Sequence, residues 1–149
     1  MKRLKIEEVV SGDQISALAV LENVCFKDEA WSEESLTAFL AAPIRHAALV
    51  FNDQGLVAYV IYNSFDGEAE IERIGVSPVH QNVHLGRTAL SQLLSEQGIK
   101  RCTLEVSTSN IAACRAYQAS GFQTIGRRHA YYHDGSDALI MEWKRTKHE

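Results

Sequence analysis

The sequence has few of the features that mark fibrous, disulfide-bonded or membrane-spanning proteins. Its 149 residues include only two prolines and nine glycines, which excludes a collagenous or proline-rich chain. Three cysteines, with no Cys-x-x-Cys spacing, are expected to be reduced thiols rather than a disulfide framework or a zinc ribbon. The longest apolar run, Leu56 to Tyr62, is far too short to cross a bilayer.

An excess of positive charge is also missing. The formal net charge is −4, which argues against binding nucleic acid through a broad basic face. The basic start of the chain is followed by Glu7 and Glu8 rather than by an apolar core, so it is not expected to be a signal peptide. We therefore expect one cytoplasmic domain over residues 1–149, with no membrane or nucleic-acid partner.

Hydrophobic spacing predicts an alternation of strands and helices. Strands are expected at 5–10, 46–51, 56–63, 68–76, 101–107, 122–127 and 138–143, and helices at about 13–24, 32–40, 87–97 and 110–120. Asp13 is the expected cap of the first helix and Gly98 the expected end of the third. This order describes an α/β (α+β) fold with a mixed sheet and packed helices, in which the crossover from 68 to 106 is parallel and right-handed.

The most informative stretch is the polar loop after strand 68–76, which reads Ile74-Gly-Val-Ser-Pro-Val-His-Gln-Asn-Val-His-Leu-Gly-Arg87. Backbone N–H groups at a helix start carry partial positive charge and could hold a pyrophosphate, with Arg87 assisting. The same residues are also compatible with an ordinary strand–helix loop. Gly75, inside the strand, indicates a bulge or the close approach of another backbone or a ligand.

This loop resembles the acetyl-CoA loop of the GNAT N-acetyltransferases, whose pattern is Gln/Arg-x-x-Gly-x-Gly/Ala. The second half of the chain resembles that family at Leu104-Glu-Val, Ser109-Asn110, Ala116-Tyr117 and Gly121-Phe122. Together with Ala30-Trp31-Ser32 and Tyr131-Tyr132, these matches resemble the RimI-type ribosomal-protein N-terminal-alanine acetyltransferases. The resemblance implies a central mixed, mostly antiparallel sheet with one splayed parallel pair of strands, flanked by helices.

The resemblance also implies acetyl-CoA as a co-substrate, its pantetheine arm lying between strands 68–76 and 101–107. The cofactor-binding positions it implies are Ile74, Gly75, Val76, Asn82, Val83, His84, Leu85, Gly86, Arg87 and Asn110. Among them, the Val76 N–H would polarise the thioester carbonyl and hold the developing oxyanion. No covalent enzyme intermediate is required, and no metal is expected.

Two residues match the catalytic positions of the family: Glu105 as general base and Tyr117 as general acid. An N-terminal amine has a pKa of ~8 and must lose a proton before it attacks a thioester, and the leaving thiolate then needs a proton. The alternative for Glu105 is an exposed strand glutamate in a salt bridge. The alternative for Tyr117 is an aromatic side chain of the core. Tyr117 lies two helical turns after Asn110, so both side chains should share one helix face. Glu72 is a rival base.

Histidines supply one departure from the family pattern. His84 stands where the first loop glycine is expected, and it either crowds the phosphate site or compensates with a bond from its imidazole. The pairs His80/His84 and His129/His133 have a spacing that could suit a metal, but no cysteine or carboxylate pattern supports one.

The expected function is transfer of acetyl from acetyl-CoA to the N-terminal α-amine of a protein, namely the N-terminal alanine of a small-subunit ribosomal protein. The acidic balance suits a basic tail, and Trp31, Tyr131 and Tyr132 are candidates for shaping the acceptor groove. Two alternatives stay open. One is a small-amine acetyltransferase of the polyamine or aminoglycoside type, and the other is a non-catalytic acyl-CoA-binding or protein-interaction module. The sequence does not indicate an oligomeric state.

Overall fold

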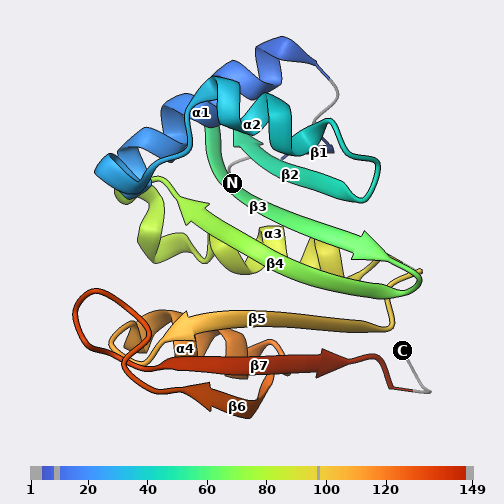
Figure 1. Ribbon diagram of the computed structural model, residues 1–149. Helices are drawn as coiled ribbons and strands as arrows, with labels where there is room; N and C mark the ends of the chain where they lie inside the picture. The colour runs from blue at the N-terminus through green and yellow to red at the C-terminus, as the bar shows by residue number, and fades with distance from the viewer. Residues whose placement is uncertain (1–4, 9–10, 97, 147–149) are drawn as a thin grey trace.

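A seven-stranded sheet runs through the molecule, and helices lie on both of its faces (Figure 1). The structure is a computed structural model that describes residues 5–8, 11–96 and 98–146, of which 81–83 are described in their backbone alone. The strands are β1 (Lys5–Glu8), β2 (Arg45–Asn52), β3 (Gly55–Phe65), β4 (Glu68–Val76), β5 (Arg101–Ser107), β6 (Gln123–Arg128) and β7 (Ala138–Lys144). Their order is β1-β2-β3-β4-β5-β7-β6, and only β4 and β5 pair in parallel. The mixed, mostly antiparallel sheet is thus confirmed.

Two pairs of helices bury the two faces of the sheet. The helices are α1 (Gly12–Phe26), α2 (Glu33–Leu40), α3 (Leu85–Leu94) and α4 (Ile111–Ala119). Leu18 of α1 and Leu36 of α2 pack with Tyr59 and Ile61 of β3 in one core. On the other face, α3 and α4 cover a second and larger core. Within the described ranges, no helix is long and apolar enough to cross a membrane.

Strands β4 and β5 separate soon after they meet. Their parallel ladder joins only Glu68–Glu70 to Arg101–Thr103, and toward their carboxyl ends the strands diverge (Figure 1). A bulge in β4 adds to the divergence, because Ile61 pairs with Arg73 and Tyr62 with Ile71, which leaves Glu72 as the extra residue. The predicted parallel pair is confirmed, and its open end is where cavities form.

Helix ends depart from the sequence prediction at two points. Ser11, not Asp13, caps α1 in a capping box: its hydroxyl accepts from the Gln14 N–H, and the Gln14 side chain accepts from the Ser11 N–H. Helix α3 ends at Leu94 rather than at Gly98. Here the Arg145 guanidinium donates to the carbonyls of Leu94 and Glu96, at 2.6 and 2.9 Å, so a distant side chain satisfies groups that a glycine cap would otherwise satisfy.

Gly75 leaves space for a side chain of the neighbouring strand. It pairs with Tyr59 across β3 and β4, and a Cβ at position 75 would overlap the Tyr59 ring. The bulge predicted here lies instead at Glu72. Gly75 therefore lets a buried tyrosine lie flat against the strand.

Candidate active site

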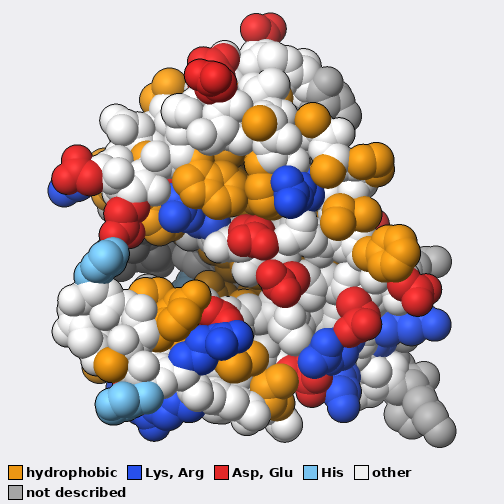
Figure 2. All heavy atoms as spheres, in the orientation of Figure 1, with side chains coloured by type: hydrophobic (Ala, Val, Ile, Leu, Met, Phe, Trp, Pro, Cys, Tyr) orange, Lys and Arg blue, Asp and Glu red, His pale blue; other side chains and the backbone are white. Residues whose placement is uncertain are grey.

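Two cavities meet where β4 and β5 diverge. The first, of about 590 Å³, lies between β4, the start of α3 and α4; we call it the cofactor cavity, after the ligand that the sequence predicts for its residues. The second, of about 580 Å³, lies between β4, β5, the end of α1 and the β6–β7 loop; we call it the acceptor cavity, after the amine that the sequence predicts beside Glu105. Ile74, Asn110, Ala113 and Tyr117 line both. Figure 2 shows the molecule hollowed in this region.

Most predicted cofactor residues with described side chains line the cofactor cavity: Ile74, Val76, His84, Gly86, Arg87 and Asn110. Leu85 does not, because its side chain is buried in the core under the sheet. Gly75 is not among the lining residues either, and the side chains of Asn82 and Val83 fall outside the described part of the structure. Arg115 of α4 lines the same cavity, although no motif in the sequence indicates it.

His84 adopts the backbone conformation that favours glycine. Its φ and ψ are 57° and 32°, in the left-handed region, where it joins the short 3₁₀ helix Pro78–Val83 to α3. This accounts for a glycine at the equivalent place in the family pattern, because glycine reaches this region without strain. Gly86, two residues later, is closely packed, because a Cβ at this position would lie 3.1 Å from Cγ2 of Val76.

Replacing this histidine separates backbone strain from ligand contact. We expect His84→Gly to stabilise the fold by about 1 kcal/mol, because a left-handed residue with a Cβ costs about that much. We also expect weaker acetyl-CoA binding, since the imidazole that can bond a phosphate is gone. Thermal unfolding and calorimetric titration of acetyl-CoA into both proteins would check the two parts. Tighter binding by the glycine variant would show that His84 only crowds the site.

Tyr117 lies at the junction of the two cavities. Its ring packs against Phe122, with 5.9 Å between centroids, and burial raises the pKa of its phenol to about 12. The phenol therefore keeps its proton throughout the neutral range. Asn110, two turns earlier, caps α4 by accepting from the Ala113 N–H at 3.2 Å. Asn110 and Tyr117 both line the two cavities, as their spacing on one helix face predicts.

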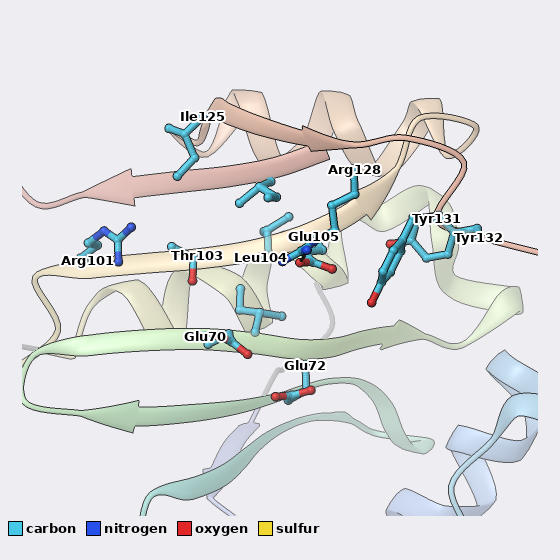
Figure 3. A pocket seen from close by; sticks show the side chains of 12 residues that line it. Glu70, Glu72, Arg101, Thr103, Leu104, Glu105, Ile125, Arg128, Tyr131 and Tyr132 are labelled. Carbon is cyan, nitrogen blue, oxygen red and sulfur yellow. Dashed lines mark hydrogen bonds and ion pairs between the residues drawn. The ribbon is translucent and has the colours of Figure 1, made fainter. Parts of the chain in front are cut away.

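Glu105 is part of an ion pair. On β5 its neighbours Leu104 and Val106 are buried in the core, whereas Glu105 points the other way and lines the acceptor cavity. The Nε of Arg128 donates to Glu105 Oε1 at 2.8 Å, and the Arg128 guanidinium lies 5.7 Å from the Tyr131 ring (Figure 3). The alternative predicted for Glu105, a strand glutamate in a salt bridge, is thus confirmed, and the same side chain also lines the acceptor cavity.

Two further carboxylates face Glu105 from the neighbouring strand. Glu70 and Glu72 of β4 line a groove of about 600 Å³ that also includes Glu105 (Figure 3). The Asn63 amide donates to Glu72 at 2.7 Å. Burial, together with the charges of Glu72 and Glu105, raises the pKa of the Glu70 carboxyl. The groove also holds the guanidinium groups of Arg101 and Arg128, so its three carboxylates exceed its cations by one, which favours a cationic ligand only modestly.

The β6–β7 loop brings two tyrosines to this groove and is held by Asp137. Tyr131 and Tyr132 contact each other edge to face, with 5.2 Å between centroids, and both line the groove. Asp137 accepts from the Ala130 N–H at 2.8 Å and from the Arg127 Nε at 2.6 Å. The Ala130 hydrogen bond and then the Arg127 charge hold the pKa of the Asp137 carboxyl below its usual range.

The lowered pKa of Asp137 makes the loop sensitive to acid. Its ionised form stabilises the fold fully above the ordinary pKa of ~3.9, and that contribution is lost as the pH falls through the lower folded-state value. We expect Asp137→Asn to speed amide hydrogen exchange of residues 129–137 at pH 7, and the difference from the unsubstituted protein to shrink below about pH 4. An undiminished difference at pH 3 would contradict this role.

Trp31, a predicted wall of the acceptor groove, lines neither cavity. Its ring lies 5.1 Å from that of Phe39 and 5.2 Å from the guanidinium of Arg73. Trp31 instead belongs to the packing that holds α1 and α2 on the sheet. Its neighbours Phe26 and Glu29 line the acceptor cavity in its place.

Known proteins resemble this chain along most of its length. Residues 15–122 match the acetyltransferase (GNAT) family. The chain is 33% identical over 117 residues to the ribosomal protein bS18-alanine N-acetyltransferase of Escherichia coli K12, covering 74% of this chain and 78% of that protein. The enzyme of the same name from Haemophilus ducreyi is 32% identical over 119 residues, covering 74% and 81%. The crystal structure of the ribosomal-protein-S18-alanine N-acetyltransferase from Escherichia coli superposes with a TM-score of 0.85 at 28% identity, covering 95% of this chain and 94% of that one.

Proposed function

Because this chain belongs to the GNAT acetyltransferase family, whose members use acetyl-CoA as co-substrate, we propose that it acetylates the N-terminal α-amine of a protein. One observation carries the proposal: two cavities join at Tyr117, one lined by groups suited to a phosphorylated cofactor and the other by carboxylates. A thioester reaching through the first cavity would meet an amine held in the second.

The cofactor cavity fits the chemistry of coenzyme A. Its lining combines apolar side chains of β4 with two guanidinium groups, Arg87 at the start of α3 and Arg115 on α4. The amino end of α3 adds partial positive charge, which favours a pyrophosphate. Where β4 leaves β5, the backbone from Ile74 to Val76 runs alongside this space, as an added extended chain would require. The bound cofactor supplies an activated acetyl thioester.

The catalytic proposal assigns one proton transfer to each of two residues. Glu105, directly or through a water, accepts a proton from the acceptor ammonium, and the neutral amine then attacks the thioester carbon. As the carbon–sulfur bond breaks, Tyr117, protonated because of its burial, gives its proton to the departing sulfur, and the second proton of the attacking nitrogen restores the phenol, directly or through a water. Before this, the acceptor ammonium competes with the Arg128 guanidinium for Glu105, since both are cations that the same carboxylate can hold.

The acceptor we propose is the N-terminal alanine of ribosomal protein bS18, the substrate named for the relatives. Glu70, Glu72 and Glu105 supply negative charge for a basic N-terminal tail. Tyr131 and Tyr132 offer rigid aromatic surfaces against which an extended peptide can lie at low entropic cost. The location this implies is the cytoplasm.

An acceptor panel tests the proposal. The protein would be incubated with acetyl-CoA and either short peptides, including one with the N-terminal sequence of bS18, or polyamines and aminoglycosides, while free thiol is measured. We expect thiol release with peptides. Release with small amines alone would support a small-amine acetyltransferase. Binding of acetyl-CoA without release by any acceptor would support a non-catalytic acyl-CoA-binding module.

A further inference from the structure

A fully buried carboxylate lies next to the acceptor cavity and has no part in the proton transfers proposed above. Glu22 of α1 is 0% exposed, and donors from three other segments surround it. The Tyr59 hydroxyl of β3 donates to Oε1 at 2.6 Å. The Trp31 N–H and the Arg73 Nη1 of β4 donate to Oε2 at 2.6 and 2.7 Å. A buried carboxylate is tolerated only when it is paired and hydrogen-bonded in this way. The three donors therefore compensate the desolvation of Glu22.

Arg73 extends this network to the segment that follows α1. Its guanidinium lies 4.0 Å from the Phe26 ring centroid and 5.2 Å from that of Trp31. Its Nη1 also donates to the Glu29 carbonyl at 3.1 Å. The planar, delocalised guanidinium can stack and donate at the same time, which an ammonium cannot do equally well. One side chain thus fastens the segment Phe26–Trp31 to β4.

The fastened segment forms part of the acceptor cavity. Phe26, Glu29 and Arg73 line it together with Glu105 and Tyr117, and none of these first three lines the cofactor cavity. Helix α1 has its own anchor, since the Cys25 thiol donates to the Val76 carbonyl at 3.3 Å. Loss of the Arg73 contacts would therefore loosen the segment after the helix rather than the helix itself.

We propose that Arg73, held by Glu22, is a positioning residue for the acceptor: it fixes Phe26–Glu29, the part of the segment that lines the cavity, as the wall against which the N-terminal residues of the acceptor lie. This inference rests on the proposed function, because it needs an acceptor in that cavity. The Glu22–Arg73 ion pair would then position the acceptor as well as stabilise the fold. A wall displaced by about an ångström misplaces the amine and can cost about 10²-fold in rate.

Arg73→Lys is the informative substitution, because it keeps a cation for Glu22 and loses the stacked planar group. We expect the KM for the acceptor peptide to rise at least tenfold and kcat/KM to fall by about 10²-fold, whereas the KM for acetyl-CoA stays within twofold. Amide hydrogen exchange at Trp31 should become faster. Exchange needs no acceptor, so it reports on the wall even where turnover is low.

Tyr62→Phe is the matched control. It removes a buried tyrosine hydroxyl that donates to Glu8 at 2.8 Å, and Tyr62 lines neither cavity. It should lower the melting temperature and leave both KM values and Trp31 exchange unchanged. If Arg73→Lys changes only the melting temperature, or moves both KM values together, the positioning role is wrong. If the unsubstituted protein acetylates no acceptor, the proposed function fails, and exchange at Trp31 decides whether Arg73 fixes the wall.

Discussion

Glu105→Gln is expected to lower kcat by about 10²–10⁴-fold, the usual contribution of a positioned general base, while the affinity for acetyl-CoA stays unchanged. Glutamine keeps the size of the side chain but cannot accept the ammonium proton. The substitution also breaks the ion pair with Arg128, in which the side chains are 35% and 54% exposed. Pairs this exposed contribute little to folding, so the melting temperature should hardly change. Steady-state kinetics, calorimetric titration and thermal unfolding check the three parts.

Glu72→Gln is the control for this prediction. Glu72 lines the acceptor cavity together with Glu105, and its hydrogen bond from Asn63 can also be accepted by a glutamine oxygen. We expect its kcat to stay within a few fold of that of the unsubstituted protein. The reverse result, with full turnover after Glu105→Gln and loss after Glu72→Gln, would move the base from β5 to β4.

Tyr117→Phe is expected to lower kcat by about 10²-fold with almost no change in melting temperature. The substitution removes one hydroxyl and keeps the ring that packs against Phe122. The departing sulfur then loses its donor, while the apolar packing under α4 stays. Loss of stability with unchanged turnover per folded molecule would show instead that Tyr117 is only a core aromatic.

The pH dependence of this pair follows from the raised pKa of Tyr117. Because burial raises it to about 12, the neutral phenol remains the donor as the pH rises. The rate should therefore increase between pH 7 and 10 as the acceptor amine loses its proton, near a pKa of ~8. The Phe variant should show the same rise at a lower level. A fall in rate before pH 10 that disappears in Tyr117→Phe would contradict this assignment.

The sequence predicts best what local patterns determine. Strand β5 begins and ends where alternation of apolar and polar residues places it, at 101–107, and β4 spans 68–76, between the Asp66-Gly67 turn and Pro78. The same alternation turns Glu105 away from the core, and the spacing of Asn110 and Tyr117 predicts that they share a lining. These features need only neighbours within one strand or one helix.

Contacts between distant segments could not be predicted from the sequence. The carbonyls at the end of α3 accept hydrogen bonds from Arg145, about fifty residues later, and no local pattern indicates that partner. Glu22 does leave a signal, since it is a charged residue beside Leu18 and Leu21 on the apolar stripe of α1. Its partners Tyr59 and Arg73 lie on other elements, however, so the network could not be identified before the fold was known. The same holds for Arg128 beside Glu105.

The most direct test of the account is to locate the acetyl group on a peptide that offers two kinds of amine. A peptide with an N-terminal alanine and an internal lysine would be incubated with the protein and acetyl-CoA, and tandem mass spectrometry would identify the modified nitrogen. Because the α-amine has a pKa of ~8 and the lysine amine one of ~10.4, the first gives up its proton to Glu105 far more readily. We predict acetylation of the N-terminal amine alone, lost in Glu105→Gln. Acetylation of the lysine, or of neither amine, would contradict the account.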